Sequence, residues 1–318
     1  RRNGEEILIR HQRYGIRAAV IEMADASGLT LVPPEKRNPL HTTTYGLGEL
    51  IRAALDDGCR RFIIGIGGSA TNDCGLGMLT ALGFRFQKAD GSPAGILGGS
   101  LAAVAAIDGT AADTRLADCT FEIACDVTNP LCGPAGCSRV FGPQKGATEA
   151  IVARMDGDIH HFAALAEEAC GTAGQDLPGA GAAGGLGFAF HVFLNGRLTP
   201  GIDLILSAIG IDKALAKADV LVTGEGRMDQ QTAMGKAPAG VAQLAKACQP
   251  HCLTLALCGS ATPEAERVNA HGIDAYFPIL HAPMTLSEAM DRTTAERNLR
   301  QTIQQVMHLI HKAAGISA

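Results

Sequence analysis

The residues best suited to chemistry lie in glycine-rich turns that follow apolar segments of the chain. In the first turn, residues 65–73, the candidate binding residues are Gly67, Gly68, Ser69, Thr71, Asn72 and Asp73. Backbone N–H groups at the start of a helix bind anions, and glycine allows a phosphate or carboxylate to approach the backbone closely. We therefore interpret this turn as an anion-binding loop. The alternative is an ordinary turn in which Thr71 or Asp73 caps the next helix.

A second turn places an acid and an amide after another apolar segment. Asp126 and Asn129 lie within residues 125–130, and Lys145 lies in the irregular stretch that follows. A carboxylate and an ammonium on adjoining loops suit a metal–phosphate site or a clamp for an anionic substrate. The alternative is an Asx-turn beside a solvated lysine. The residue types favour a site for a small anion.

A further polar stretch, residues 222–236, again follows an apolar segment. Its ionisable candidates are Glu225, Arg227, Asp229 and Lys236. The stretch is not a P-loop, because Gln230 stands where that motif needs its first glycine and Ala237 replaces its Ser or Thr. One interpretation is that the charged residues form salt bridges among themselves. We prefer a site at the end of a strand.

The sequence of residues 179–184 matches a dinucleotide-binding motif. Their glycines satisfy G-x-G-x-x-G, and Asp203 follows at roughly the spacing of the acid that binds the ribose. That pattern must follow a strand, and residues 174–178 do not have the sequence of one. We therefore expect a loop that leads into a helix and whose glycines allow close packing. A nucleotide-dependent dehydrogenase is kept as an alternative.

Composition excludes several classes of protein. The chain has 318 residues, of which 47% are hydrophobic and 19% charged, so disorder is excluded as the main state. Its 39 glycines follow no collagen period, and a net charge of −5 without a basic block argues against nucleic-acid binding. No apolar run is long enough for a membrane span, and we find no secretory signal. Ten cysteines without zinc-ligand spacing indicate reduced thiols in a cytoplasmic protein.

Strands and helices must position these turns, and the hydrophobic pattern predicts both. We predict strands at residues 17–22, 61–66, 120–125, 219–222, 252–257 and 273–277. We predict helices at residues 44–57, 73–82, 149–170, 187–194, 202–209, 212–217, 236–248 and 285–311. Strands that alternate with helices predict an α/β fold with a mainly parallel sheet. Ligands of such sheets bind beyond the carboxyl ends of the strands.

Taken in order along the chain, these segments resemble the bacterial type-1 glycerate kinase family, whose members are kinases without a P-loop. The segments that carry the resemblance are residues 19–24, 27–29, 43–51, 65–73, 125–131, 140–147, 181–185 and 223–227. They extend over nearly the whole chain from Ala18 onward. Such a series in a single order is far more specific than any one loop.

The resemblance implies ATP-dependent phosphorylation of D-glycerate with Mg²⁺, in the cytoplasm, within sugar-acid or glyoxylate catabolism. The implied product is 2-phosphoglycerate, with 3-phosphoglycerate as the alternative. The resemblance also implies two α/β domains with the active site in the cleft between them. Residues 1–200 would form a mixed α/β domain with the glycine-rich loops, and residues 201–318 a Rossmann-like domain.

Two features of the family do not occur in this sequence. Family members open with a strand and a D-S-F-K loop, and a D-G-G-E-G-T segment follows soon after. We therefore expect the chain to lack the family's N-terminal segment. We expect a monomer or a homodimer that binds D-glycerate and ATP and has neither nucleic-acid nor membrane partners.

Roles can be assigned to the candidate residues as hypotheses under this resemblance. Residues 67–73 and Lys145 would hold the carboxylate of glycerate or phosphate groups. Asp126 or Asp229 would bind Mg²⁺ or accept the hydroxyl proton. Further residues expected to bind substrate or phosphate are Asn129, Glu225, Arg227 and Lys236. Besides the dehydrogenase, a second alternative is a non-catalytic protein that binds small anions and is degenerate at its N-terminus.

Overall fold

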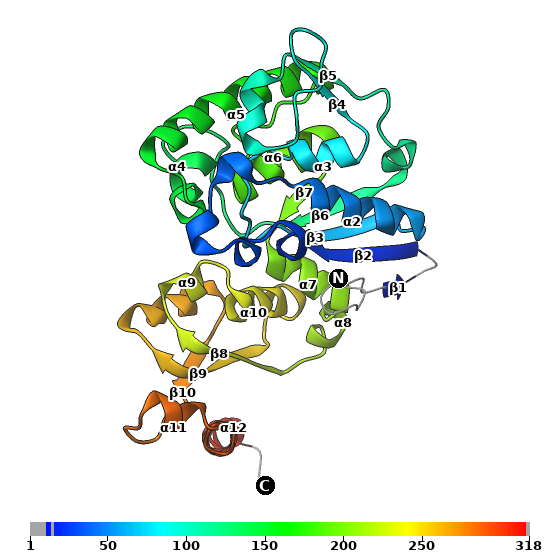
Figure 1. Ribbon diagram of the computed structural model, residues 1–318. Helices are drawn as coiled ribbons and strands as arrows, with labels where there is room; N and C mark the ends of the chain where they lie inside the picture. Colours follow the sequence, from blue (N-terminus) through cyan, green and yellow to red (C-terminus); the bar gives the residue numbers. More distant parts are fainter. Residues whose placement is uncertain (1–10, 14–15, 316–318) are drawn as a thin grey trace. The chain divides into compact units, whose positions relative to one another are not determined.

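The computed structural model describes residues 11–13 and 16–315, and the chain divides into two compact units (Figure 1). Unit 1 comprises residues 1–204 and unit 2 comprises residues 205–318. Each unit contains parallel strands that are joined through helices. The predicted α/β class with mainly parallel sheets is therefore confirmed.

The main sheet of unit 1 has the strand order β1-β2-β3-β6-β7. Its strands are β1 (His11–Arg13), β2 (Ile16–Glu22), β3 (Arg61–Gly65), β6 (Thr120–Ala124) and β7 (Arg197–Thr199). β1 runs antiparallel to β2, and the other neighbouring strands are parallel. The register aligns the last residues of the parallel strands, which are Glu22, Gly65, Ala124 and Thr199. The loops that follow these strands therefore begin at one edge of the sheet.

Helices connect these strands in unit 1. They are α1 (Ala24–Ser27), α2 (Tyr45–Asp56), α3 (Leu76–Ala81), α4 (Cys137–Phe141), α5 (Glu149–Cys170) and α6 (Ala182–Leu194). Short 3-10 turns occur at η1 (Leu29–Leu31), η2 (Pro34–Lys36), η3 (Pro39–His41), η4 (Gly98–Ala103), η5 (Thr114–Asp118) and η6 (Pro143–Lys145). A separate antiparallel pair consists of β4 (Arg85–Gln87) and β5 (Ala106–Asp108).

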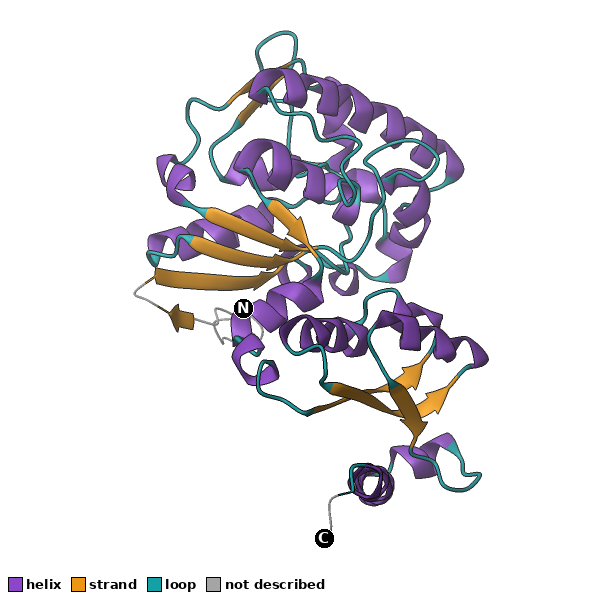
Figure 2. Cartoon of the chain, turned by 180° about the vertical axis from the view of Figure 1, so that it is seen from behind, coloured by secondary structure: helices purple, strands orange, loops and turns teal. Residues whose placement is uncertain are grey.

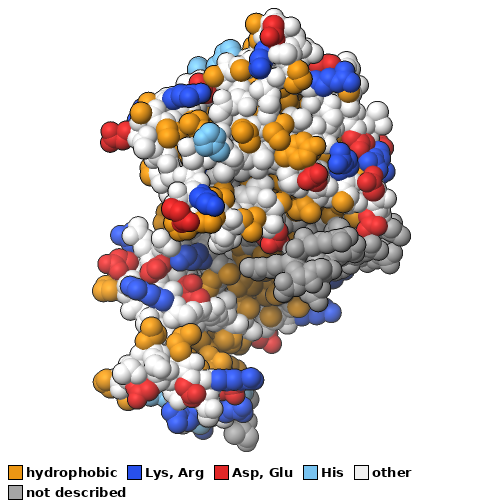
Figure 3. All heavy atoms as spheres, viewed as in Figure 1, with side chains coloured by type: hydrophobic (Ala, Val, Ile, Leu, Met, Phe, Trp, Pro, Cys, Tyr) orange, Lys and Arg blue, Asp and Glu red, His pale blue; other side chains and the backbone are white. Residues whose placement is uncertain are grey.

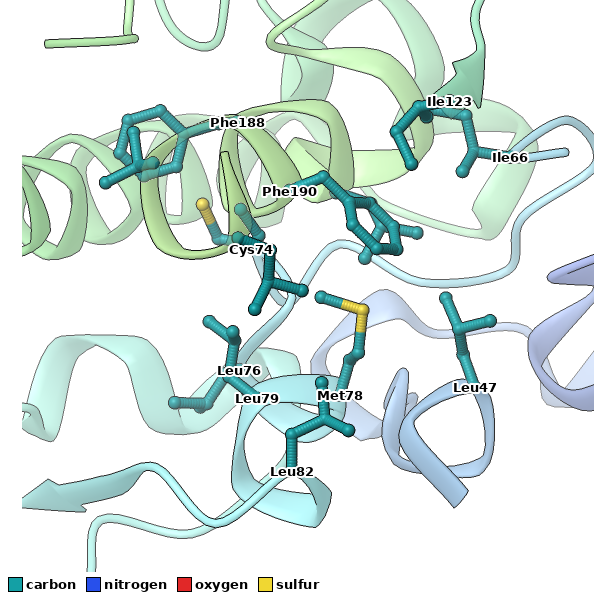
Figure 4. Close-up of a cluster of buried hydrophobic side chains, with 14 of the residues drawn as sticks. Leu47, Ile66, Cys74, Leu76, Met78, Leu79, Leu82, Ile123, Phe188 and Phe190 are labelled. Carbon is teal, nitrogen blue, oxygen red and sulfur yellow. The ribbon is translucent and has the colours of Figure 1, made fainter. Parts of the chain in front are cut away.

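The core of unit 1 lies against one face of the main sheet. Every second side chain of β3 and β6 is buried there, and the rings of Phe62 and Phe121 stack with centroids 4.9 Å apart. Figure 4 shows side chains of α2, α3 and α6 gathered in one cluster, among them Leu47, Met78 and Phe190. A fully buried side chain of this size contributes about 1.5–3 kcal/mol. This packing fixes the strand ends from which the polar loops start.

Unit 2 is built on a three-stranded parallel sheet with the order β10-β9-β8 (Figure 2). Its strands are β8 (Val220–Met228), β9 (Leu253–Ala261) and β10 (Ala275–Pro278). Its helical segments are α8 (Asp212–Leu215), α9 (Gln230–Ala233), α10 (Ala237–Cys248), η7 (Pro263–His271), α11 (Leu286–Met290) and α12 (Arg292–Ala313). α7 (Gly201–Ile209) begins in unit 1 and ends in unit 2. Small side chains such as Ala242 and Ala256 dominate the core of this unit.

The predicted strand at residues 219–222 is too short, because β8 continues to Met228. Its glycines predict a turn, but they instead allow the backbones of β8 and β9 to approach closely. A Cβ atom on Gly224 of β8 would clash with the carbonyl oxygen of Leu257 on β9, and one on Gly259 of β9 would lie 2.6 Å from the carbonyl oxygen of Gly226 on β8. Glycine in a strand often marks such a close approach. Glu225 and Arg227 therefore belong to the strand and not to the loop after it.

Three predicted helices also differ from the structure. α3 begins at Leu76 and not at residue 73, because Cys74 and Gly75 have positive φ angles of 49° and 73°. α6 is bounded at residue 182, but residues 183–185 have positive, non-helical φ angles, so its regular part begins within one residue of the predicted start at 187. The predicted helix 285–311 is divided into α11 and α12 by Asp291, whose carboxylate accepts the N–H of Thr294 at 2.9 Å. The short elements β4, β5, β7 and α4 have too few residues for a periodic pattern and were missed.

Candidate active site

A pocket of about 360 Å³ lies at the carboxyl-end edge of the main sheet of unit 1. The predicted site residues that line it are Gly67, Gly68, Ser69, Asp126 and Lys145. They come from three segments that are far apart in the sequence: the loop after β3, the loop after β6 and the turn η6. The structure therefore brings the glycine turn, the acid and the lysine together, as parallel strand ends make possible.

A larger pocket of about 790 Å³ lies beside α5 and contains none of the predicted site residues. Its lining includes Asp156, His160 and Glu167. Glu167 accepts backbone N–H groups of residues 174 and 175 at 2.7 and 3.0 Å, and Asp156 accepts the N–H of Gly133 at 3.1 Å. These carboxylates hold loops in place. The smaller pocket is the better candidate, because it combines a buried cation with open backbone donors.

The loop after β3 presents its backbone to the smaller pocket. A Cβ atom on Gly67 would meet no atom within 4 Å, so the space beside this residue is open to a ligand. Gly68 has a φ angle of +70°, which L side chains rarely adopt. Its carbonyl accepts the N–H of Leu29 at 2.8 Å, and Ala70 donates to the carbonyl of Ser27 at 2.9 Å. These bonds fix the loop while leaving its glycines accessible.

Lys145 is buried, with 2% of its surface exposed, although it lines the pocket. Its Nζ donates to the carbonyl oxygen of Thr71 at 2.6 Å. Burial lowers the pKa of this lysine to about 8, and the neighbouring Cys137 and Asp73 oppose that effect. Within residues 11–13 and 16–315, no carboxylate forms an ion pair with Lys145. A buried ammonium without a counter-ion attracts an anionic ligand.

Asp73 does not line the pocket, and its carboxylate anchors the loop from behind. It accepts the N–H and the hydroxyl of Thr44 at 2.7 and 2.8 Å, and the N–H groups of Gly75 and Gly77 at 3.3 Å. Full burial raises the pKa of Asp73, and these hydrogen bonds oppose the increase. Sequence analysis missed Thr44, whose hydroxyl also accepts the N–H of Met78 at 2.9 Å. Its place directly before α2 was the available signal, but it suggests only a helix cap.

Asn72 connects the loop after β3 to α4. Its Nδ2 donates to Ser138 Oγ at 2.9 Å and lies 3.6 Å from the sulfur of Met155. The Oδ1 atom of Asn72 and the hydroxyl of Thr71 are buried without a partner in the described part of the chain. Neither residue lines the pocket. α4 leads directly to Lys145, so this contact helps to fix the lysine relative to the glycine loop.

The glycines of residues 179–185 pack against two loops: Gly179 and Gly181 against the loop after β6, and Gly184 and Gly185 against the loop after β3. The carbonyl of Gly184 accepts the N–H of Cys74 at 2.9 Å, and a Cβ atom on Gly184 would lie 2.6 Å from the Cα of Asn72. A Cβ atom on Gly185 would lie 3.0 Å from the Cα of Cys74. The expectation of close packing at these glycines is therefore confirmed. The glycines of the G-x-G-x-x-G motif make tight backbone contacts within unit 1.

The two candidates after β6 are placed differently. Asp126 is exposed at the pocket, and its Oδ1 accepts the N–H of Gly201 at 2.8 Å, which leaves Oδ2 available. Asn129 does not line the pocket, and its Nδ2 donates to the carbonyl of Ala135 at 2.9 Å. Asp126 is thus positioned to meet a ligand, whereas the amide of Asn129 closes its own turn.

Of the four candidates of unit 2, Glu225 and Arg227 lie on β8, Asp229 follows it directly, and Lys236 lies just before α10. Asp229 caps α9 by accepting the N–H of Gln231 at 2.9 Å, and its Oδ1 lies 3.7 Å from the Nζ of Lys236. The hydroxyl of Thr232 donates to Glu225. The capping role of Asp229 and its ion pair with Lys236 match the interpretation in which these charged residues interact with one another. Arg227 is exposed.

The described residues contain neither a helix that could cross a bilayer nor a cluster of side chains that could hold a metal ion. On the face shown in Figure 3, acidic and basic side chains are interspersed. No described helix combines the length and the apolar character that a bilayer crossing requires. Within the same residues, no three side chains of His, Cys, Asp or Glu are grouped so that they could hold a metal ion.

Comparisons with known proteins agree with one another. The sequence model of the glycerate kinase family matches residues 4–311. The glycerate kinase of Bacillus subtilis (strain 168) is 48% identical over 301 residues, which are 92% of this chain and 78% of that protein. The glycerate 2-kinase of Escherichia coli (strain K12) is 46% identical over 292 residues, covering 90% of this chain and 76% of that protein.

The fold is similar to a solved structure. A crystal structure of a protein from Salmonella typhimurium LT2, provisionally named glycerate kinase 2, superimposes with a TM-score of 0.81 and 44% sequence identity. The match covers 94% of this chain and 77% of that one. The family match over most of the chain, the relatives near half identity and the shared fold lead to one conclusion. The chain belongs to the glycerate kinase family.

Proposed function

We propose that this protein transfers the γ-phosphoryl group of ATP to a hydroxyl group of D-glycerate. The observation that carries the proposal is the buried, unpaired ammonium of Lys145 in a pocket of about 360 Å³ beside an open glycine loop. A pocket of this size suits a three-carbon acid. The names of the B. subtilis and E. coli relatives support the same substrate.

Phosphoryl transfer depends mainly on positioning and on stabilising negative charge. In the proposed site, Lys145 pairs with the carboxylate of glycerate, and the N–H groups of residues 67–69 bind its oxygens or those of the transferred group. The substrate hydroxyl oxygen forms the new bond to phosphorus while the bond from phosphorus to the bridging oxygen of ADP breaks. Burial of Lys145 strengthens its attraction to the acid, because the local dielectric constant is low.

Magnesium is the metal that the family implies, and the site offers it one suitable carboxylate. Mg²⁺ binds nucleotides through one or two protein carboxylates, several waters and the phosphates themselves. The exposed Asp126, with Oδ2 available, would be such a ligand. When bound, the ion would neutralise phosphate charge. Asp229 fits less well, because its carboxylate already caps α9 and lies near Lys236.

The other candidates keep narrower roles in this proposal. Within unit 2, Arg227 and Lys236 are proposed to bind phosphate groups, a task that the exposed guanidinium of Arg227 suits, and Glu225 is proposed to hold Thr232 beside them. Asn129 and residues 71–73 hold the loops of the site in place and do not contact the ligand. We also propose 2-phosphoglycerate as the product, on the basis of the name of the E. coli relative.

The proposal is tested by a coupled assay of ADP release with D-glycerate, in which phosphorus NMR identifies the phosphorylated carbon. We expect turnover that requires both ATP and D-glycerate, with phosphate on C2. Phosphate on C3 would correct the product. Glycerate binding without any ADP release would instead favour a non-catalytic binding protein. No observation favours a dehydrogenase, because the glycines of residues 179–185 are occupied by packing contacts.

A further inference from the structure

Glu22 is an exposed acid at the edge of the sheet where the candidate pocket lies. It is the last residue of β2, and the register pairs it with Gly65 at the end of β3. Gly65 in turn pairs with Ala124 at the end of β6, and Ala124 lines the pocket. Within residues 11–13 and 16–315, the carboxylate of Glu22 has neither a hydrogen bond nor an ion pair. Both of its oxygens are therefore available.

Gly65 determines where this carboxylate lies. A Cβ atom on Gly65 would be 2.6 Å from both the Cδ and the Oε1 of Glu22, which is closer than real Cβ atoms come to other heavy atoms. Side chains at paired positions of adjacent parallel strands lie on the same face of the sheet. The carboxylate of Glu22 therefore lies across the end of β3, on the face that also carries the side chain of Ala124. Any other residue at position 65 would fill this space.

The other carboxylates near the pocket are less free to receive a proton. Asp73 is fully buried and accepts four hydrogen bonds. Asp126 accepts the N–H of Gly201 through one oxygen and is the residue that fits the metal. A general base must reach the substrate hydroxyl and must have a free lone pair directed toward the pocket. Glu22 does not itself line the pocket, but both of its oxygens are free within the described part of the chain, and its carboxylate lies over Gly65, which is paired with Ala124 of the pocket lining.

We propose that Glu22 is the proton acceptor for the substrate hydroxyl in this site. The proposal rests on the proposed kinase function. As the hydroxyl oxygen bonds to the γ-phosphorus of ATP, its proton moves to the carboxylate of Glu22, and the bond to the bridging oxygen of ADP breaks. The products are the phosphate ester, ADP and a protonated Glu22, which then releases its proton to water. Gly65 has a positioning role, because it leaves the space that this carboxylate occupies.

Two variants and their combination test the assignment. Glu22→Gln should lower kcat by roughly 100- to 10,000-fold, the usual contribution of a general base, while the Kd of D-glycerate from calorimetry changes little. Gly65→Ala should also lower kcat, because its methyl group displaces the end of a flexible side chain and not the backbone. In the Glu22→Ala background, the added Gly65→Ala should cause no further loss. Glu122→Gln is the matched control, since this acid on β6 is paired with Arg61 at 2.8 Å.

The outcomes separate this inference from the proposed function. A full kcat in Glu22→Gln, with an active unmodified protein, would overturn the role of Glu22 and leave the kinase proposal standing. Losses that multiply when Gly65→Ala is added to Glu22→Ala would overturn the positioning role of Gly65. An unmodified protein that shows no ATP-dependent phosphorylation of D-glycerate would overturn both proposals. Thermal unfolding of each variant shows whether a loss of activity reflects a loss of fold.

Discussion

Replacing Lys145 with methionine should stabilise the folded protein near neutral pH while it weakens substrate binding. Burial lowers the pKa of this lysine from 10.5 to about 8, so the charged form opposes folding. The difference corresponds to roughly 3 kcal/mol, and the destabilisation is complete below pH 8. The carbonyl of Thr71 loses its donor in the variant, which offsets about 1–3 kcal/mol of the gain.

The pH dependence of stability gives the sharper measurement. Between pH 8 and 10.5 the unfolded chain retains a proton at this lysine that the folded protein releases, so the stability of the unmodified protein rises with pH. From pH 7 to pH 10 this group contributes a rise of roughly 2–3 kcal/mol. Methionine binds no proton, so Lys145→Met should lack that rise. Urea unfolding of both proteins at the two pH values measures the difference.

Activity should change in the opposite direction to stability. Loss of a buried, charge-assisted contact with a carboxylate costs about 2–4 kcal/mol of binding free energy, which lowers kcat/KM for D-glycerate by roughly 30- to 1,000-fold. In the unmodified protein, the KM for D-glycerate should increase as the pH rises through about 8, because the neutral amine no longer attracts the acid. Steady-state kinetics over about three pH units, from roughly pH 6.5 to 9.5, measure the loss of kcat/KM in the variant and the rise of KM in the unmodified protein.

A matched control separates this lysine from lysines in general. Lys88 is exposed and lies away from the pocket lining, so Lys88→Met should change neither kcat/KM nor the pH dependence of unfolding beyond about 0.5 kcal/mol. The reasoning about Lys145 is refuted if Lys145→Met keeps the full rise in stability between pH 7 and pH 10. It is equally refuted if that variant binds D-glycerate as tightly as the unmodified protein.

Three further predictions follow from other contacts of the site. Asp73→Ala removes the acceptor of four hydrogen bonds and should lower the free energy of unfolding by about 3 kcal/mol or more, measured by urea titration. Gly184→Ala should destabilise by several kcal/mol, because the new Cβ lies 2.6 Å from the Cα of Asn72. Gly91→Ala, with a similar positive φ and open space, should lose only about 1 kcal/mol, and equal losses would contradict the packing argument. Asp126→Asn should raise the Mg²⁺ concentration needed for half-maximal activity, and an unchanged Mg²⁺ dependence would remove Asp126 from the metal site.

Much of the fold was predictable from local pattern. The predicted helix at residues 149–170 coincides with α5, and the predicted strands at 61–66 and 120–125 agree with β3 and β6 to within one residue. These segments succeed because their hydrophobic periodicity is regular and their ends have clear caps or glycines. The extent of β8 was not predictable in this way. Its glycines have the local character of a turn, and only the pairing with β9 shows that they lie in a strand.

The candidate site, too, was predictable in part. The sequence identifies the glycine turn, Asp126 and Lys145 as suited to an anion, and the structure places them around one pocket. The sequence does not reveal that Asp73, Asn72 and Asn129 lie outside the pocket lining and bond to other parts of the chain, because residue type says nothing of side-chain direction. Thr44 was missed for the same reason, since its partner lies 29 positions further along the chain.

By itself the sequence determined the α/β class, the family resemblance and the residue types of an anion site, because these depend on periodicity and on short motifs. Only the tertiary structure decided which of those residues meet. Parallel pairing aligned the ends of β2, β3 and β6, and that alignment brought Glu22 over Gly65. Burial then gave Lys145 its lowered pKa, which is a property of its surroundings and not of lysine.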